Sequence, residues 1–292
     1  MYLYMKQKIL IFGANGQLGH DLLRTLSPEY EVIGVGHDRV DITNIVQVSE
    51  CIKNELPNIV INAAAYNKVE EAEQNPQLAY QVNAIGTYQI ARAAKENNIP
   101  ILHVSTDYVF DGTTVDGFAE DDYVRPLNVY GASKEAGETL VRISNPKHWI
   151  VRTSALFGIH TGGGKGYNFV TRMISIAKEK KEVKVVADQW TTPTYTLDLA
   201  LGIKKIILND VPFGTYHLVN EGSTTWHHFA QKIFEFSALS PTLIQITTAQ
   251  SGTKINRPKK SILKNTKLKS LGIMLPTWED ATKRYLRELN TK

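Results

Sequence analysis

Short apolar runs alternate with longer amphipathic stretches through the first half of the chain. The apolar runs are rich in Ile and Val without regular polar alternation, which is typical of parallel strands covered by helices on both faces. These predicted strands are residues 8–12, 31–35, 58–64 and 100–107. The stretches between them have helical periodicity and cover residues 17–29, 44–55, 76–97 and 129–144. This alternation predicts an α/β fold with a doubly wound parallel sheet.

The pattern becomes less regular after residue 150. Residues 148–158 and 184–189 predict strands, with a helix over 166–181 between them and a loop at Gly162–Gly166. Further elements are expected near 216–219, 224–236 and 277–289. We therefore expect a first domain over residues 1–150 and a smaller lobe formed mainly by 151–292, from which the chain can return to the first sheet.

A glycine-rich turn directly follows the first predicted strand. Residues 13–19 read GANGQLG and open the first predicted helix, which is where a Rossmann dinucleotide fold needs its phosphate turn. Gly13 would permit the tight turn, Gly16 the approach of a pyrophosphate, and Gly19 close packing of helix and strand. A second run, GGGKG at 162–166, is not a P-loop, because Ile159 and Gly166 stand where Gly and Ser or Thr are required.

The end of the second strand leaves the choice of dinucleotide open. Asp38 could bind the ribose 2′-hydroxyl of NADH, whereas Arg39, with His37 beside it, could bind the 2′-phosphate of NADPH. Each could equally be a solvated turn residue. Asp41 and the residues after it could face the adenine ring.

Three polar side chains predict carbonyl chemistry. Tyr130 and Lys134 are four residues apart on a predicted helix, so they share one face. Thr106 stands at the end of the fourth strand. A neighbouring ammonium favours the phenolate and makes tyrosine a usable acid, and a hydroxyl can bind a ketone oxygen. With the glycine turn, this set predicts a dehydrogenase or reductase that protonates the alkoxide as hydride arrives.

Composition narrows the class further. The chain has 292 residues, 42 % of them hydrophobic, and a formal net charge of +4, which is too mild to favour nucleic acid. Cys51 is the single cysteine, so an internal disulfide is excluded and a reducing compartment is favoured. Lys6 and Lys8 interrupt an N-terminal apolar run that is too short for a signal peptide or membrane span. We expect a cytoplasmic protein that binds neither nucleic acid nor membrane.

Motifs over nearly the whole chain resemble the extended short-chain dehydrogenases, and among them the reductases of dTDP-sugars. The matching segments are GANGQLG, DIT, NAAAYNKVEEAE, VNAIGT, STDYVFDG, PLNVYGASKEAGE, RTSALFG, DQWTTPT, TTWHHFA and RPKKSILK. The resemblance implies reduction of the C4 ketone of dTDP-4-dehydro-L-rhamnose by NADPH or NADH. It makes Thr106, Tyr130 and Lys134 catalytic, with Lys134 also holding the nicotinamide ribose, and it makes a homodimer possible.

The resemblance also implies binding residues. Those expected at the cofactor are Gly13, Asn15, Gly16, Gln17, Leu18, Gly19, Asp41, Ile42, Ala63, Ala64, Ala65, Tyr66, Asn67 and Asn83, the last of which would support the active-site helix. Those expected at the substrate are Val69, Thr106 and Asp107 at the sugar, and Asn168, Phe169 and Arg257 toward the nucleotide. Arg257 could equally be a solvated loop residue.

Two positions depart from the family. Ala155 stands where the family often has a substrate-contacting Trp, so either Trp190 or Tyr195 fills that space or the sugar pocket differs. Asp21 matches one ligand of a shared Mg²⁺ known in some members, but Leu197 occupies the other position, so no metal is expected. Two alternatives stay open: another nucleotide-sugar epimerase or reductase, and a non-catalytic dinucleotide-binding subunit resembling the β subunit of methionine adenosyltransferase.

Overall fold

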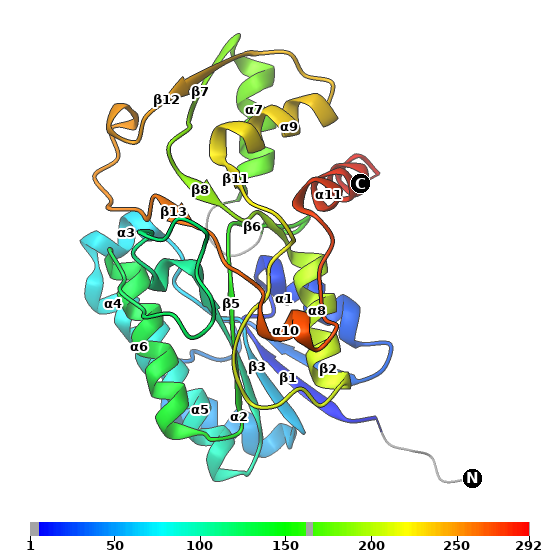
Figure 1. Ribbon diagram of the computed structural model, residues 1–292. Helices are drawn as coiled ribbons and strands as arrows, with labels where there is room; N and C mark the ends of the chain where they lie inside the picture. The colour runs from blue at the N-terminus through cyan, green and yellow to red at the C-terminus, as the bar shows by residue number, and fades with distance from the viewer. Residues whose placement is uncertain (1–5, 162–165, 292) are drawn as a thin grey trace.

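Six parallel strands form the central sheet of the computed structural model, which describes residues 6–161 and 166–291 (Figure 1). The strand order is β10-β5-β4-β3-β1-β2, and all neighbouring pairs are parallel. The strands are β1 (Lys8–Phe12), β2 (Glu31–Val35), β3 (Ile59–Asn62), β4 (Ile101–Thr106), β5 (His148–Thr153) and β10 (Gly214–His217). Residues 9–12 of β1 are fully buried, as the unbroken apolar run of a central strand predicts.

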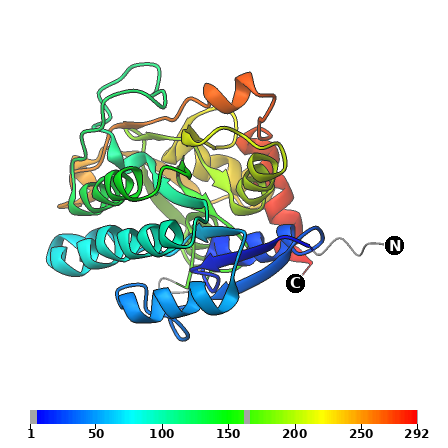
Figure 2. The ribbon, with the colours of Figure 1, turned by 90° about the horizontal axis from the view of Figure 1, so that it is seen from below.

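Helices cover both faces of this sheet. On one face α1 (Gln17–Leu26), α8 (Thr196–Leu208) and the short α10 (Lys267–Ser270) enclose a core with β1, β3 and β5. On the other face α2 (Ile45–Glu55), α5 (Thr87–Glu96) and α6 (Val129–Ser144) enclose a second core. Figure 2 shows α5 and α6, in cyan and green, side by side in this layer. The doubly wound fold expected from the sequence is confirmed.

A smaller lobe lies beyond the carboxyl ends of the strands (Figure 1). Its core contains Phe157, Tyr195, Phe229, Trp278 and Tyr285. The main elements are α7 (Phe169–Glu179), α9 (Trp226–Phe236), α11 (Trp278–Asn290) and the paired strands β7 (Glu182–Val186) and β12 (Thr242–Ile246). Short strands join the lobe to the sheet: β6 (Leu156–Phe157), β8 (Trp190–Thr191), β9 (Thr194–Tyr195), β11 (Thr224–Thr225) and β13 (Lys260–Ser261).

The second half of the chain contributes more to the sheet domain than its irregular pattern suggested. The boundary expected at residue 150 falls inside β5, and α8 and β10 return to the sheet. Helix α8 was not expected, because its apolar residues face both α1 and the sheet and leave little amphipathic pattern. The strand predicted over 148–158 ends at Thr153, since Ala155 has φ +44° and breaks the extended backbone.

The helix predicted over 76–97 is continuous but irregular. It consists of α4 (Pro76–Tyr80), a π-helical turn (Gln81–Gly86) and α5. Such π turns are rare and often occur at functional sites. The glycine loop expected at 162–166 lies outside the described residues except for Gly166. In the part of the chain that is described, no helix is long and apolar enough to cross a membrane.

Candidate active site

The glycine turn lies where the strand order reverses, between β1 and β3. Gly13 has φ +82°, and a Cβ added to it would lie 2.5 Å from the Ala64 nitrogen after β3. A Cβ at Gly19 would lie 2.3 Å from the Gly13 carbonyl oxygen. Gly16 caps α1 without a side-chain hydrogen bond, and the first turn has no acidic residue. The helix N-terminus therefore fits an anionic pyrophosphate.

Substitution of Gly13 by alanine is expected to weaken dinucleotide binding at least about tenfold, because a side chain at this strained φ also collides with the Ala64 backbone. Fluorescence titration with NADPH measures the effect. Gly252→Ala is the matched control, since Gly252 has a similar φ of +71° with no atom within 4 Å of an added Cβ. Equal loss of binding in both variants would refute a role for the tight packing at Gly13.

Both candidate determinants of the dinucleotide lie exposed after β2. The Asp38 carboxylate accepts a hydrogen bond from Asn15 Nδ2 at 2.9 Å, which ties it to the glycine turn. Arg39 donates to the Gly34 carbonyl at 3.3 Å. Because acid and base occupy the same edge, the geometry favours neither NADH nor NADPH.

The candidate adenine residues follow at Asp41 and Ile42. Although partial burial disfavours its charge, hydrogen bonds from the backbone and hydroxyl of Thr43 lower the pKa of Asp41. Ile42 is buried against Gly86, where a Cβ would come within 2.8 Å of its side chain. These contacts hold the segment rigidly after β2.

The loop after β3, with Ala63, Ala64, Ala65, Tyr66 and Asn67, is joined to helix α6 through Asn83. The Asn83 side chain is fully buried in the π-helical turn. Its Oδ1 accepts from Tyr66 N at 2.8 Å, and its Nδ2 donates to the Tyr66 carbonyl at 3.0 Å and to Ser133 Oγ at 3.0 Å. Asn83 therefore holds the loop against α6, the supporting role expected of it.

Thr106, Tyr130 and Lys134 gather at the carboxyl end of β4 and the first turns of α6. Asn128 caps α6, accepting from Gly131 N at 2.9 Å. A Cβ at Gly131 would lie 2.1 Å from the Tyr108 carbonyl oxygen, so this glycine lets the end of β4 approach the helix. The close approach brings a strand-end hydroxyl next to the phenol.

The pKa shifts of Tyr130 and Lys134 bear on which of the two carries a proton at neutral pH. Burial raises the pKa of Tyr130, against the opposing effect of its hydrogen bond with Thr106. Burial lowers the pKa of Lys134 to about 8, while Glu138 opposes this shift. The Lys134 Nζ donates to the Val104 carbonyl at 2.7 Å. At neutral pH Tyr130 therefore keeps its proton and can act as an acid, with a cation held nearby.

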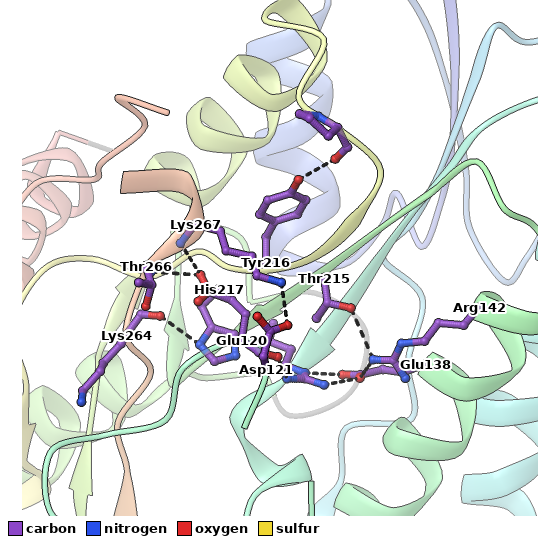
Figure 3. A network of polar contacts seen from close by, with 12 residues as sticks. Glu120, Asp121, Glu138, Arg142, Thr215, Tyr216, His217, Lys264, Thr266 and Lys267 are labelled. Atoms are coloured by element: carbon purple, nitrogen blue, oxygen red, sulfur yellow. Dashed lines mark hydrogen bonds and ion pairs between the residues drawn. The ribbon is translucent and has the colours of Figure 1, made fainter. Parts of the chain in front are cut away.

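A buried ionic network supports α6 from behind (Figure 3). Arg152 on β5 binds both Glu138 oxygens, at 2.8 and 2.7 Å, and Arg142 adds a third contact at 2.6 Å. Glu138 is fully buried, yet these cations lower the pKa of its carboxyl. Arg152 also donates to the Glu120 carbonyl at 3.1 Å.

Glu120 connects the network to the start of α10, in the C-terminal part of the chain. Its Oε1 accepts from the backbone nitrogens of Thr266 and Lys267, both at 3.0 Å, at the start of α10. Nearby, His217 Nδ1 lies 3.0 Å from the Lys264 carbonyl, and burial beside Arg152 lowers the His217 pKa to about 4. Helix α6 is thus linked to elements far along the sequence (Figure 3).

Two candidate sugar residues differ in their freedom to bind a ligand. Val69 begins the short α3 (Val69–Gln74) and is partly exposed. Asp107 is buried, and its carboxylate accepts from Thr106 at 2.9 Å, Ser154 at 2.9 Å and Ser261. Burial raises the pKa of Asp107, against the hydrogen bonds from these hydroxyls. Asp107 therefore joins β4, β5 and β13 around the site.

The three candidates toward the nucleotide occupy different settings. Asn168 caps α7, and its Nδ2 donates to Gly158 O at 2.9 Å and Gln17 Oε1 at 3.3 Å, so a ligand would have to displace these bonds. Phe169 packs on Trp226 with ring centroids 4.6 Å apart. Arg257 forms an ion pair with Glu70 at the start of α3. This ion pair connects the segment after β12 with α3.

Tyr195, one of the two candidates to take the place of the missing Trp at Ala155, belongs to the core of the lobe. Tyr195 is fully buried in the lobe core, and its hydroxyl donates to Glu288 at 2.6 Å. Trp190 is 40 % exposed and pairs with the strand that carries Ser261, so it remains a candidate.

Asp21, the candidate metal ligand, lies in a protein contact. Its carboxylate accepts from Thr196 at 2.5 Å between α1 and α8, and burial raises its pKa. Among the described residues, no group of three or more His, Cys, Asp or Glu side chains is placed to hold a metal ion.

Several residues of the site escaped the sequence interpretation. Asn62, Glu138, Arg152 and Ser261 lie inside the matching segments but were given no role, and His103 lies outside them; these residues meet only after the strands pair. For Asn62 and His103 the available signal was a polar residue within an otherwise apolar strand.

A dinucleotide turn together with Thr106, Tyr130 and Lys134 at the carboxyl edge of the sheet is the arrangement of an extended short-chain dehydrogenase/reductase.

Comparison with known proteins narrows this class. Residues 7–291 match the family described as RmlD substrate binding domain, and the chain belongs to this family. It is 38 % identical to the spore coat polysaccharide biosynthesis protein SpsK of Bacillus subtilis, over 96 % of this chain and 97 % of that protein. It is 41 % identical to the dTDP-4-dehydrorhamnose reductase of Aggregatibacter actinomycetemcomitans, over 94 % of this chain and 97 % of that protein.

Solved structures agree. The dTDP-4-dehydrorhamnose reductase of Bacillus anthracis, in complex with NADP, superposes with a TM-score of 0.92 and 41 % identity, covering 97 % of this chain and all of that one. The resemblance inferred from the motifs is thereby confirmed at the level of the family.

Proposed function

We propose that this protein reduces the C4 ketone of dTDP-4-dehydro-L-rhamnose with NADPH or NADH and yields dTDP-L-rhamnose. One observation carries the proposal: Thr106, Tyr130 and Lys134 lie at the same carboxyl edge of the sheet as the glycine turn, in a chain 41 % identical to a dTDP-4-dehydrorhamnose reductase. The glycine turn and α1 would hold the dinucleotide pyrophosphate. The bound dinucleotide supplies a hydride.

The side chains of this protein supply the proton and the orientation. Thr106 and Tyr130 hydrogen-bond with each other, so both hydroxyls can converge on a ketone oxygen. Tyr130 gives its proton to that oxygen as negative charge develops there. Lys134, buried one turn along α6, favours the resulting phenolate by its positive charge.

We assign the nucleotide-sugar side of the site to the lobe formed mainly by residues 151–292. Among its contacts with the first domain, Ser261 donates to Asp107 after β4 and Arg257 pairs with Glu70 on α3. The guanidinium of Arg257 suits a diphosphate, which it could bind in place of the carboxylate. The proposal includes a cytoplasmic location, supported by the single Cys51, and a homodimer, which sedimentation equilibrium tests.

The test incubates purified protein with dTDP-4-dehydro-L-rhamnose and follows the absorbance of NADPH and NADH in parallel. We expect oxidation of at least one dinucleotide and formation of dTDP-L-rhamnose, and the faster one resolves the competition between Asp38 and Arg39. Dinucleotide binding without oxidation would contradict the proposal and direct attention to another sugar, with Ala155 as the first residue to examine.

A further inference from the structure

Lys134 shares its buried site with a histidine that the proposed mechanism leaves unused. His103 lies on β4 and is fully buried. Its Nε2 is 3.3 Å from the Lys134 Nζ, and its Nδ1 is 3.2 Å from the Asn62 Nδ2. A neutral imidazole donates from only one ring nitrogen, so the partner of one nitrogen decides what the other can do.

Asn62 decides the tautomer. Its Oδ1 accepts from the Ala64 backbone nitrogen at 3.1 Å, and this bond fixes the orientation of the amide because only the amide oxygen can accept from an N–H. The Nδ2 then donates its two hydrogens, one to Thr87 Oγ1 at 3.1 Å and one to His103 Nδ1. His103 therefore carries its proton on Nε2 and directs it at Lys134.

This arrangement distinguishes the two charge states of Lys134. A neutral amine accepts the Nε2–H through its lone pair, whereas an ammonium opposes it with a second donor. The other tautomer would relieve that conflict only by setting Nδ1–H against the Asn62 amide. We propose that His103 and Asn62 are positioning residues that stabilise the neutral amine of Lys134 and so set the pH at which Lys134 exchanges its proton.

Charged groups around the pair act in known directions. Burial, together with Lys134 and Arg142, holds the pKa of His103 well below its usual range, so the ring stays neutral. Glu138 on α6 raises the Lys134 pKa, but Arg142 and Arg152 bind that carboxylate. The other partners, Asn62 on β3 and Thr87 on α5, are uncharged.

The consequence for catalysis rests on the proposed function. After Tyr130 has protonated the sugar oxygen, one proton passes from the Lys134 ammonium to the phenolate. The amine left behind accepts the Nε2–H of His103, and a proton from solvent later restores the ammonium. Because the ammonium is the active form, kcat/KM for reduction falls as pH rises through the Lys134 pKa.

Two variants remove, in different ways, the Asn62–His103 hydrogen bond that keeps the His103 proton on Nε2. In Asn62→Asp the carboxylate accepts from both Ala64 N–H and His103 Nδ1–H, so the Nε2 lone pair turns to Lys134, and the added negative charge acts in the same direction. In His103→Gln the charge is unchanged, and the amide can turn its carbonyl oxygen to the ammonium. We expect the Lys134 pKa to rise by about one unit or more in both.

Thr87→Val is the matched control, since it removes one buried acceptor of Asn62 but leaves the His103 tautomer in place. The measurement is an NMR titration of protein labelled with ¹³Cε-lysine, with the Lys134 signal assigned by its loss in Lys134→Arg. The alkaline limb of the kcat/KM profile should shift in parallel, to higher pH in the first two variants and not in Thr87→Val.

Folded Asn62→Asp and His103→Gln proteins in which Lys134 titrates as in the wild type would overturn the inference. So would an equal shift in Thr87→Val. The NMR titration needs neither substrate nor dinucleotide, so a wild-type protein that fails to reduce the sugar would refute the proposed function alone.

Discussion

Tyr130→Phe is expected to lower kcat/KM for sugar reduction by at least about 10²-fold, the scale of losing a general acid. The phenol is the proton donor that the geometry offers beside Thr106, and phenylalanine keeps the ring and its edge contact with Tyr108, at a centroid distance of 5.7 Å. Dinucleotide affinity should stay unchanged, because the glycine turn is untouched. Steady-state kinetics and a fluorescence titration with NADPH measure the two effects.

Tyr216→Phe provides the matched control. It also removes one tyrosine hydroxyl, which donates to the Pro212 carbonyl at 2.6 Å behind the site (Figure 3). Its activity should remain within about threefold of wild type, despite a stability loss of about 1 kcal/mol from the broken hydrogen bond. A Tyr130→Phe enzyme as active as Tyr216→Phe would show that the proton comes from elsewhere.

Arg152→Met is expected to destabilise the protein by about 3–5 kcal/mol, the usual cost of leaving a buried charge without its partner. Arg152 holds both oxygens of the fully buried Glu138, and the partly exposed Arg142 contacts only one of them. Chemical denaturation at pH 7 measures the loss. Lys232→Met, which breaks an exposed ion pair with Glu235 and a long cation–π contact with Phe236, at 5.8 Å, should change the midpoint little.

The loss of stability in Arg152→Met should become smaller as the pH falls. Since the folded-state pKa of Glu138 is depressed, its pairing contributes stability above the unfolded-state pKa of about 4.3, and this is lost as pH falls through the folded-state value. The difference between wild type and Arg152→Met should therefore be full at pH 7 and shrink below about pH 4. The double variant with Glu138→Gln should recover part of the stability, and no recovery would argue against an uncompensated charge as the cause.

Local features of the sequence predicted the sheet and the central residues of the site. The glycine turn, the spacing of Tyr130 and Lys134, and the strand-end position of Thr106 each follow from a few consecutive residues. Other residues of the site are far apart in the sequence and become neighbours only when the strands pair and α6 packs on them. Asn62, His103 and Lys134, on β3, β4 and α6, are the example.

The roles of other residues could not be predicted from the local sequence, because one residue type can serve several purposes. Asn168 has the polarity of a ligand residue but caps a helix, and Tyr195 has the size to fill a substrate pocket but lies in the lobe core. Helix α8 escaped because burial on more than one side removes amphipathic periodicity. In each case tertiary packing, not local propensity, determines the role.

The most direct test of the reductase assignment follows the hydride itself. Protein, dTDP-4-dehydro-L-rhamnose and NADPH carrying deuterium at both nicotinamide C4 positions are incubated, and the sugar product is examined by NMR and mass spectrometry. We predict one deuterium at carbon 4 of dTDP-L-rhamnose for each NADPH oxidised. A product epimerised without deuterium, or an unchanged sugar beside bound dinucleotide, would contradict the assignment.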